Sequence, residues 1–95
     1  MKHTGHHFED ENERAAGGTD FGPGWCIAWQ HGPVGDEQNG ALVEDVISAA
    51  LDRLLHLQDS SAACLEFEAA IEHCERALHV LEDRKKHNAG QSGET

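Results

Sequence analysis

The sequence predicts a mainly helical fold with a small β element: an antiparallel two-helix hairpin that follows a short N-terminal strand or hairpin, completed by homo-oligomerisation. Two patterns indicate this class. Apolar residues recur at spacings of three and four on both sides of a short polar break, and an earlier stretch alternates apolar residues with period two. Length supplies the third observation, because 95 residues with 38% hydrophobic content make a domain that usually needs a disulfide, a metal or a partner chain.

The overall charge narrows the possible partners. Eighteen acidic and seven basic side chains give a formal net charge of −11, which disfavours nonspecific binding to nucleic acid or to anionic membranes. The first 18 residues lack the apolar core of a signal peptide, and no window approaches a membrane span. We therefore expect a cytoplasmic protein with no nucleic-acid or membrane partner.

The cysteines do not form a disulfide framework by number or by spacing. There are three of them, and Cys64 and Cys74 lie ten residues apart on one predicted helix, which separates their backbones by roughly 15 Å. We expect buried, free and unreactive thiols, since all three cysteines lie within apolar patterns.

Residues 1–20 are predicted to form a disordered arm, because they hold a run of acidic residues and almost nothing to bury. His3, His6 and His7 could bind a metal, but a flexible polar arm supplies no preorganised ligand geometry. The sequence therefore favours a solvated segment over a metal site.

A strand is predicted next, because Trp25, Ile27 and Trp29 alternate with smaller or polar residues between glycine- and proline-containing breakers. Such a short strand must pair with another strand of the same chain or of a neighbouring one. Both tryptophans of the chain lie on one face of it. They either cover the helices, which the sequence favours, or form a platform that stacks on a base.

The first predicted helix starts after Asn39-Gly40, where Asn39 is a plausible N-cap and Glu44 and Asp45 favour the positive end of the helix dipole. Its apolar positions are Leu42, Val43, Val46, Ile47, Ala50, Leu51, Leu54 and Leu57. The break at residues 59–61 is short enough for only an antiparallel turn, with Ser60 or Ser61 capping the next helix.

The second predicted helix runs from Ala63 to Arg84. Its apolar positions are Ala63, Cys64, Phe67, Ala70, Ile71, Cys74, Ala77, Leu78 and Leu81. Both stripes are too wide for one partner helix to cover, so we expect a homo-oligomer of hairpins. The strand and the hairpin make one domain over residues 21–88, and residues 89–95 are predicted to be a disordered tail.

The chain lacks the motifs of common catalytic sites. No glutamate is followed three residues later by a histidine on either helix, so the di-iron bundle pattern is absent. Neither a glycine-rich phosphate loop nor a nucleophile elbow occurs. We therefore expect a non-enzymatic binding protein without a metal or another cofactor.

An ordered set of short motifs resembles a family of phage proteins with a helical hairpin domain. The motifs are Trp29-Gln30-x-Gly32-Pro33-Val34, Asn39-Gly40, Glu44-Asp45-Val46, Leu51-Asp52-Arg53-Leu54, Leu57-Gln58, Ala63-Cys64-x-Glu66, Ala70-Ile71, Glu75, Ala77-Leu78-His79 and Leu81-Glu82-x-Arg84. The chain resembles, from about Trp25 to Arg84, the immune-signal sponges known as Thoeris anti-defence protein one and, more distantly, anti-CBASS protein two.

This resemblance implies a function. Members assemble as dimers or hexamers and sequester cyclic nucleotide signals, such as cyclic ADP-ribose isomers and cyclic oligonucleotides, without cleaving them, in the cytoplasm of the infected bacterium. Aromatic rings would stack on adenine and arginines would contact phosphates. The ligand-binding residues that we expect on this basis are Trp29, Gln30, Asn39, Arg53, Leu57, Glu66, Phe67, Arg84 and Asn88.

The chain also departs from the family pattern. Leu65-Glu66-Phe67 stands where the family usually has Arg-Glu-Asn, Leu57 where Phe is common, Val80 where Trp is common and Asn88 where a second arginine is common. Of those pocket positions Arg84 is retained. The alternatives are therefore an altered ligand preference, a pocket at another interface, or a structural or protein-binding oligomer without a nucleotide ligand. A metal-binding regulator ranks third.

Overall fold

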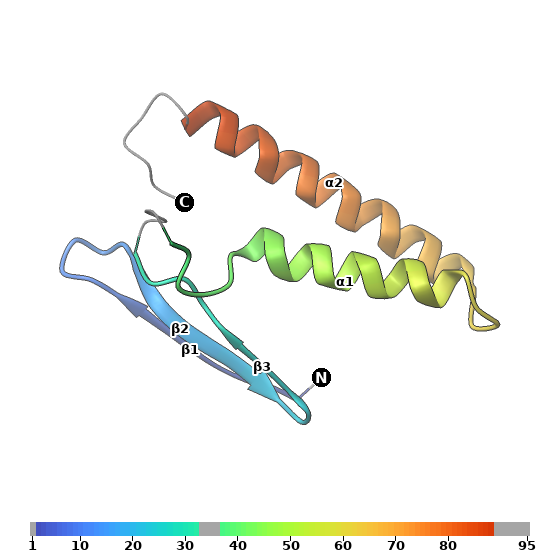
Figure 1. Cartoon of the computed structure of the whole chain (residues 1–95), viewed down its shortest axis with the longest axis horizontal. Coiled ribbons are helices and arrows are strands. Elements are labelled where there is room, and N and C mark those ends of the chain that lie inside the picture. The colour runs from blue at the N-terminus through green and yellow to red at the C-terminus, as the bar shows by residue number, and fades with distance from the viewer. Residues whose placement is uncertain (1, 33–36, 89–95) are drawn as a thin grey trace. The chain divides into compact units, whose positions relative to one another are not determined.

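The computed structural model describes residues 2–32 and 37–88, which form two compact units with a boundary between Leu42 and Val43. The first unit holds a three-stranded antiparallel sheet, and the second is a hairpin of two helices, as predicted (Figure 1). The domain expected over residues 21–88 therefore spans the boundary between these units. The predicted tail at residues 89–95 lies outside the described residues.

The sheet contains more of the chain than the sequence predicts. Its strands are β1 (Thr4–Glu9), β2 (Ala15–Gly22) and β3 (Trp25–Ala28), in that order across the sheet. The structure thus places two strands where a disordered arm is expected. These strands carry few apolar residues, and they are held by the antiparallel backbone ladder, in which β2 is the central strand.

A turn built around Asp10 connects β1 and β2. Its carboxylate Oδ1 accepts hydrogen bonds from the backbone N–H groups of Asn12 (2.8 Å) and Arg14 (3.0 Å), and the Asp10 N–H donates to the Arg14 carbonyl. Glu13 adopts a left-handed conformation with φ 62°. The backbone hydrogen bond from Arg14, followed by that from Asn12, holds the pKa of the Asp10 carboxyl below its usual value.

The sheet has two faces that differ in chemistry. Residues directly paired across strands lie on the same face. One cross-strand row consists of Thr4, Phe21 and Cys26, and a second row consists of His6, Thr19 and Ala28; these six residues form the Phe21 face. The opposite face, the Asp20 face, contains His3, Gly5, His7, Gly18, Asp20, Gly22, Trp25 and Ile27.

Ring contacts agree with this division. His6 and Phe21 stack on the Phe21 face, with ring centroids 6.5 Å apart, while His3 and Trp25 meet on the Asp20 face at 6.0 Å. The tryptophans of the chain therefore do share the side predicted for them, since Trp29 follows β3 and bonds to Asp20.

The helical hairpin consists of α1 (Val43–Gln58) and α2 (Leu65–Asn88), which pack against each other in antiparallel fashion (Figure 1). Two predicted caps are wrong. Asn39 lies four residues before α1, and its side chain bonds to the backbone of His31 instead of the helix. Ser60 closes the end of α1, because its hydroxyl donates to the Leu57 carbonyl and accepts from the Ala62 N–H.

The described residues contain no fully buried hydrophobic side chain. The apolar stripes of α1 and α2 are half-buried, and large apolar side chains such as Val43, Leu65 and Val80 are exposed. Cys26 is exposed, contrary to the expectation of three buried thiols, while Cys64 and Cys74 are half-buried; all three are free. Within the described part of the chain, no helix combines the length and the apolarity needed to cross a bilayer.

Candidate functional site

Trp29 belongs to a polar cluster on the Asp20 face of the sheet. Its indole Nε1–H donates to Asp20 Oδ2 at 2.7 Å, and its backbone N–H donates to the Gly18 carbonyl at 3.0 Å. The Nε2 atoms of His3 and His7 lie 3.6 Å and 3.5 Å from the carboxylate oxygens of Asp20. Asp20 is therefore flanked by two imidazoles and fixed by one indole, with its side chain only 15% exposed.

Two glycines leave the space that this cluster needs. A Cβ on Gly5 would lie 2.4 Å from Asp20 Oδ1, and a Cβ on Gly22 would lie 2.6 Å from Trp25 Nε1. The Asp20 carboxylate and the Trp25 indole thus fold over the bare backbone of the neighbouring strand. Ordinary side chains at these two positions would displace both groups.

Gln30 and Asn39 lie close together, and their side chains bond to the backbone. Gln30 Oε1 accepts from the N–H groups of Asn39 (2.9 Å) and Gly40 (3.1 Å). Asn39 Oδ1 accepts from the His31 N–H at 2.8 Å, and Asn39 Nδ2 donates to the His31 carbonyl at 3.0 Å. With the parallel bridge between Trp29 and Ala41, these bonds tie the segment before α1 to the chain after β3.

Gln30 also has one unused donor. Its side chain is the one buried side chain among the described residues, at 8% exposure. Its Nε2 atom is buried and has no hydrogen-bond partner in the part of the chain that the structure describes. A buried amide donor left without an acceptor costs about 1–3 kcal/mol, so this group favours an acceptor oxygen.

The other expected ligand-binding residues lie on the hairpin. Arg53 and Glu66 are exposed, Leu57 and Phe67 are half-buried, and Arg84 is exposed. Asn88 is the last residue of α2, and its side chain lies outside the described residues. No ion pair involves Arg53 or Arg84 within residues 2–32 and 37–88, so both guanidinium groups can meet an anion.

These hairpin residues separate into two groups. Leu57, Glu66 and Phe67 lie at the end of the hairpin that carries the connecting turn, because α1 ends at Gln58 and α2 begins at Leu65. Arg84 lies 17 residues beyond Phe67 on α2, which is roughly 25 Å along a helix. One copy of the hairpin therefore does not bring Phe67 and Arg84 to the same ligand.

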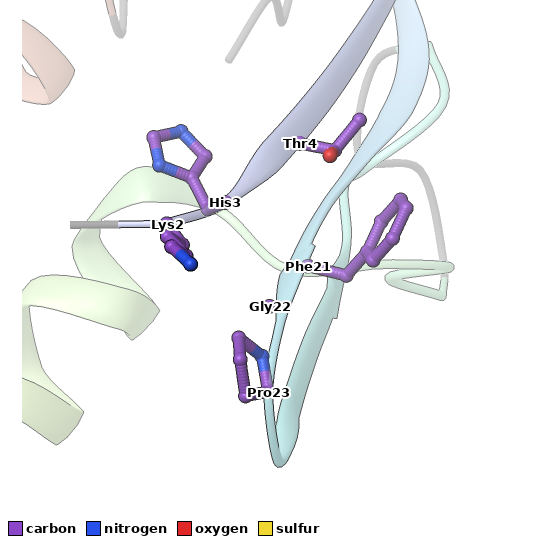
Figure 2. Close-up of a pocket in the computed structure, with 6 residues that line it drawn as sticks. All are labelled: Lys2, His3, Thr4, Phe21, Gly22 and Pro23. Carbon is purple, nitrogen blue, oxygen red and sulfur yellow. The ribbon is translucent and has the colours of Figure 1, made fainter.

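A hollow of about 530 Å³ lies where β1 begins and β2 ends. Its lining consists of Lys2, His3, Thr4, Phe21, Gly22 and Pro23. Figure 2 shows Lys2, His3 and Pro23 on one side of β2 and the Phe21 ring on the other, so the two kinds of side chain do not face one another. None of the residues predicted to bind a ligand lines this hollow.

His3, His7 and Asp20 are not among the predicted site residues, because the sequence predicts a disordered arm over residues 1–20. Two features of the sequence could have indicated these strands. Asp and Asn at positions 10 and 12 favour a turn, and Thr19 and Phe21 alternate with Asp20 and Gly22 as in a strand. Despite the concentration of histidines, the described residues contain no group of three or more His, Cys, Asp or Glu side chains that could hold a metal ion.

The fold and these side chains define a class: a small helical-hairpin binding module, preceded by a sheet, with free arginines and a half-buried aromatic ring on its helices. The chain belongs to the Acb2/Tad1 hairpin-domain family, whose model matches residues 27–84, from within β3 to near the end of α2. Proteins of this family sequester immune signals and are not enzymes. Neither the comparison with curated proteins nor that with solved structures gives a match.

Proposed function

We propose that this protein is a phage anti-defence sponge that binds and sequesters a cyclic nucleotide immune signal in the cytoplasm of the infected host. The signal is a cyclic ADP-ribose isomer or a cyclic oligonucleotide, and its removal blocks Thoeris or CBASS signalling. The observation that carries this proposal is the family match, which covers the whole of α1 and most of α2. Such a sponge acts by mass action, holding the free signal below the concentration that activates the host effector.

The hairpin supplies groups that suit this ligand. Phe67 offers an aromatic face for stacking on adenine, and Arg53 and Arg84 offer exposed guanidinium groups for bidentate bonds to phosphate. A dianionic ligand is repelled by a chain with a net charge of −11. The positive charges of Arg53 and Arg84 are therefore needed at the site to offset this repulsion.

The separation of Phe67 from Arg84 supports a site built from more than one copy. If two hairpins associate in antiparallel fashion, the turn end of one copy lies beside the open end of another, which would bring these two residues to the same ligand. The half-buried stripes of α1 and α2 provide the apolar surface for that association. We therefore expect a homo-oligomer, a dimer or a hexamer, as the binding form.

Calorimetry tests the proposal directly. The assembled protein is titrated with cyclic ADP-ribose isomers, cyclic dinucleotides and cyclic trinucleotides, and we expect heat of binding for at least one class. Recovery of the unchanged ligand after denaturing the protein would distinguish sequestration from cleavage. Absence of binding to every ligand, from a folded oligomer, would refute the proposal.

Arg84→Ala tests the site. We expect a loss of about 1.5–3 kcal/mol of binding free energy, equivalent to roughly a 10- to 100-fold weaker affinity, because a hydrogen-bonded charge contact with phosphate disappears. Stability should not change, since Arg84 is exposed. Arg76→Ala, an exposed arginine on the same helix outside the proposed set, is the matched control. Equal affinities of the two variants would remove Arg84 from the site.

One observation favours the alternative of a structural or protein-binding oligomer without a nucleotide ligand. Gln30 and Asn39 are two of the polar residues that we expected to bind a ligand. In the structure their side chains form hydrogen bonds with the backbone that stabilise the first unit. In that alternative, oligomer formation is retained and every nucleotide titration is flat.

A further inference from the structure

Asn39 and Gly40 form a dipeptide that is chemically unstable in a flexible chain. Asparagine is a thermolabile residue, because the backbone nitrogen of the next residue can attack its side-chain amide carbon. Glycine hinders this attack least, since it has no Cβ and the most conformational freedom. Asn39 is exposed and Gly40 is half-buried, so water has access to the pair. The segment before α1 therefore contains a candidate site of spontaneous deamidation.

The fold nevertheless requires both residues. A Cβ on Gly40 would lie 2.5 Å from the carbonyl carbon and oxygen of Trp29, so the backbones can approach this closely only with glycine. The Asn39 side chain both accepts from the His31 N–H (2.8 Å) and donates to the His31 carbonyl (3.0 Å). An aspartate carboxylate could accept in this way but could not donate. Neither residue can therefore be replaced by a less reactive one without losing a contact.

The same hydrogen bonds occupy the atoms that would react. The Gly40 nitrogen is the attacking atom, and its N–H donates to Gln30 Oε1 at 3.1 Å. Both polar atoms of the Asn39 amide are bonded to the His31 backbone. Attack needs a free, deprotonated nitrogen and an amide that is free to turn toward it. These hydrogen bonds must therefore open before the reaction can begin.

We propose that Asn39 is a deamidation site that the fold keeps closed, and that Gln30 is the residue that keeps it closed. Local opening frees the Gly40 N–H from Gln30 Oε1. The Gly40 nitrogen then gives its proton to a solvent base and forms a bond to Asn39 Cγ, while the bond from Cγ to Nδ2 breaks and Nδ2 leaves as ammonia with a proton from water. A second water molecule opens the resulting succinimide at either carbonyl, which yields aspartate or isoaspartate.

Deamidation would loosen the first unit. The Nδ2 donor of Asn39 becomes an oxygen, which cannot bond to the His31 carbonyl. In the isoaspartate product the main chain also gains one carbon atom before Gly40. This insertion shifts Ala41, whose N–H donates to the Ala28 carbonyl (2.7 Å) and whose carbonyl accepts from the backbone N–H of residue 30 (2.9 Å). The modification therefore breaks the pairing between the end of β3 and the segment before α1.

The first test compares the full-length protein with a short peptide of residues 37–42. Both are incubated at mildly alkaline pH, and mass spectrometry follows the conversion of the Asn39 amide to a carboxylate in the digested protein and in the peptide. We expect the protein to react at least about tenfold more slowly, which corresponds to an opening free energy of about 1.4 kcal/mol or more. Equal rates in the protein and the peptide would overturn the proposal.

A pair of variants tests the role of Gln30. Gln30→Met keeps a long side chain but has no oxygen to accept from Gly40, so deamidation should be at least about tenfold faster than in the wild type. Gln30→Glu is the matched control. It keeps an acceptor for the N–H groups of Asn39 and Gly40 and loses only the Nε2 donor, which has no partner among the described residues, so it should react as slowly as the wild type. Equal rates for Gln30→Met and the wild type, or for the two variants, would overturn the assignment.

Hydrogen exchange of the wild type covers the case in which Gln30→Met does not fold. Exchange of the Gly40 amide and deamidation both begin with loss of the same proton, so both should be slowed by a similar factor relative to the peptide. A Gly40 amide that exchanges as fast in the protein as in the peptide would overturn the proposal. All of these measurements are made without a nucleotide, so a flat nucleotide titration would refute the proposed function and leave this inference standing.

Discussion

Replacing Gly5 with alanine should destabilise the sheet through Asp20. The new Cβ would lie 2.4 Å from Asp20 Oδ1 and 3.3 Å from His7 Nε2. Ordinary van der Waals contact begins at 3.4 Å, so the carboxylate must retreat by 1.0 Å, the difference between the two distances. A movement of that size breaks the 2.7 Å bond that Trp29 Nε1 donates to Asp20 Oδ2.

The expected magnitude follows from two opposing effects. Loss of a hydrogen bond to a charged group costs about 1.5–3 kcal/mol. Alanine in place of glycine inside a strand returns about 0.5–1 kcal/mol, because glycine loses more backbone entropy on folding. Gly5→Ala should therefore lower the free energy of unfolding by about 0.5–2.5 kcal/mol. In an Asp20→Ala background the clash is absent, and the same substitution should stabilise by about 0.5–1 kcal/mol.

Urea unfolding measures this reversal of sign. Trp25 and Trp29 report on the sheet by fluorescence, and the four proteins of the cycle are compared at one protein concentration because assembly contributes to stability. If Gly5→Ala changes the free energy of unfolding equally in both backgrounds, the close approach of Asp20 to Gly5 plays no part and the reasoning fails.

Two further predictions concern the backbone of the first unit. Gly40→Ala should cost about 1–3 kcal/mol in urea unfolding, because its Cβ would lie 2.5 Å from the carbonyl carbon and oxygen of Trp29, which are main-chain atoms that cannot rotate away; an unchanged midpoint would contradict this contact. Asp10 has a pKa below its usual value, so its contribution to the β1–β2 turn is present above the ordinary carboxyl pKa and is lost as the pH falls through the lowered value. NMR titration of the Arg14 amide should follow this loss in the wild type and not in Asp10→Asn, and the same titration in both would count against it.

The hairpin could be predicted from sequence because its signal is local. Apolar residues at helical spacing and a polar break of a few residues fix two helices and an antiparallel turn without any knowledge of distant contacts. The helix ends are harder to predict from the sequence. α2 begins at Leu65, and the Cys64 N–H just before it donates to Gln58 Oε1 instead of to a serine side chain. A glutamine that reaches back from the end of the preceding helix leaves no pattern in sequence.

The sheet was hidden for a different reason. β1 and β2 have little apolar alternation, since His6, His7, Gly17 and Gly18 occupy positions where a strand pattern would show valine or isoleucine. Their pairing depends on register across the sheet, which a single sequence does not reveal. Gln30 and Asn39 illustrate the same limit, because both residues could be selected from the sequence while the backbone groups that they bind could not.

The position of β3 has a practical consequence for anyone who trims this protein to its family domain. β3 pairs with β2 on one edge and is followed by the bridge from Trp29 to Ala41 on the other. A fragment that starts at Trp25 would lose β2 and present a strand of Trp, Cys, Ile and Ala with a free ladder edge and no charge or proline to block stacking. In the intact chain the hairpin of β1 and β2 occupies that edge, so we expect it to keep the edge from pairing with a strand of another chain.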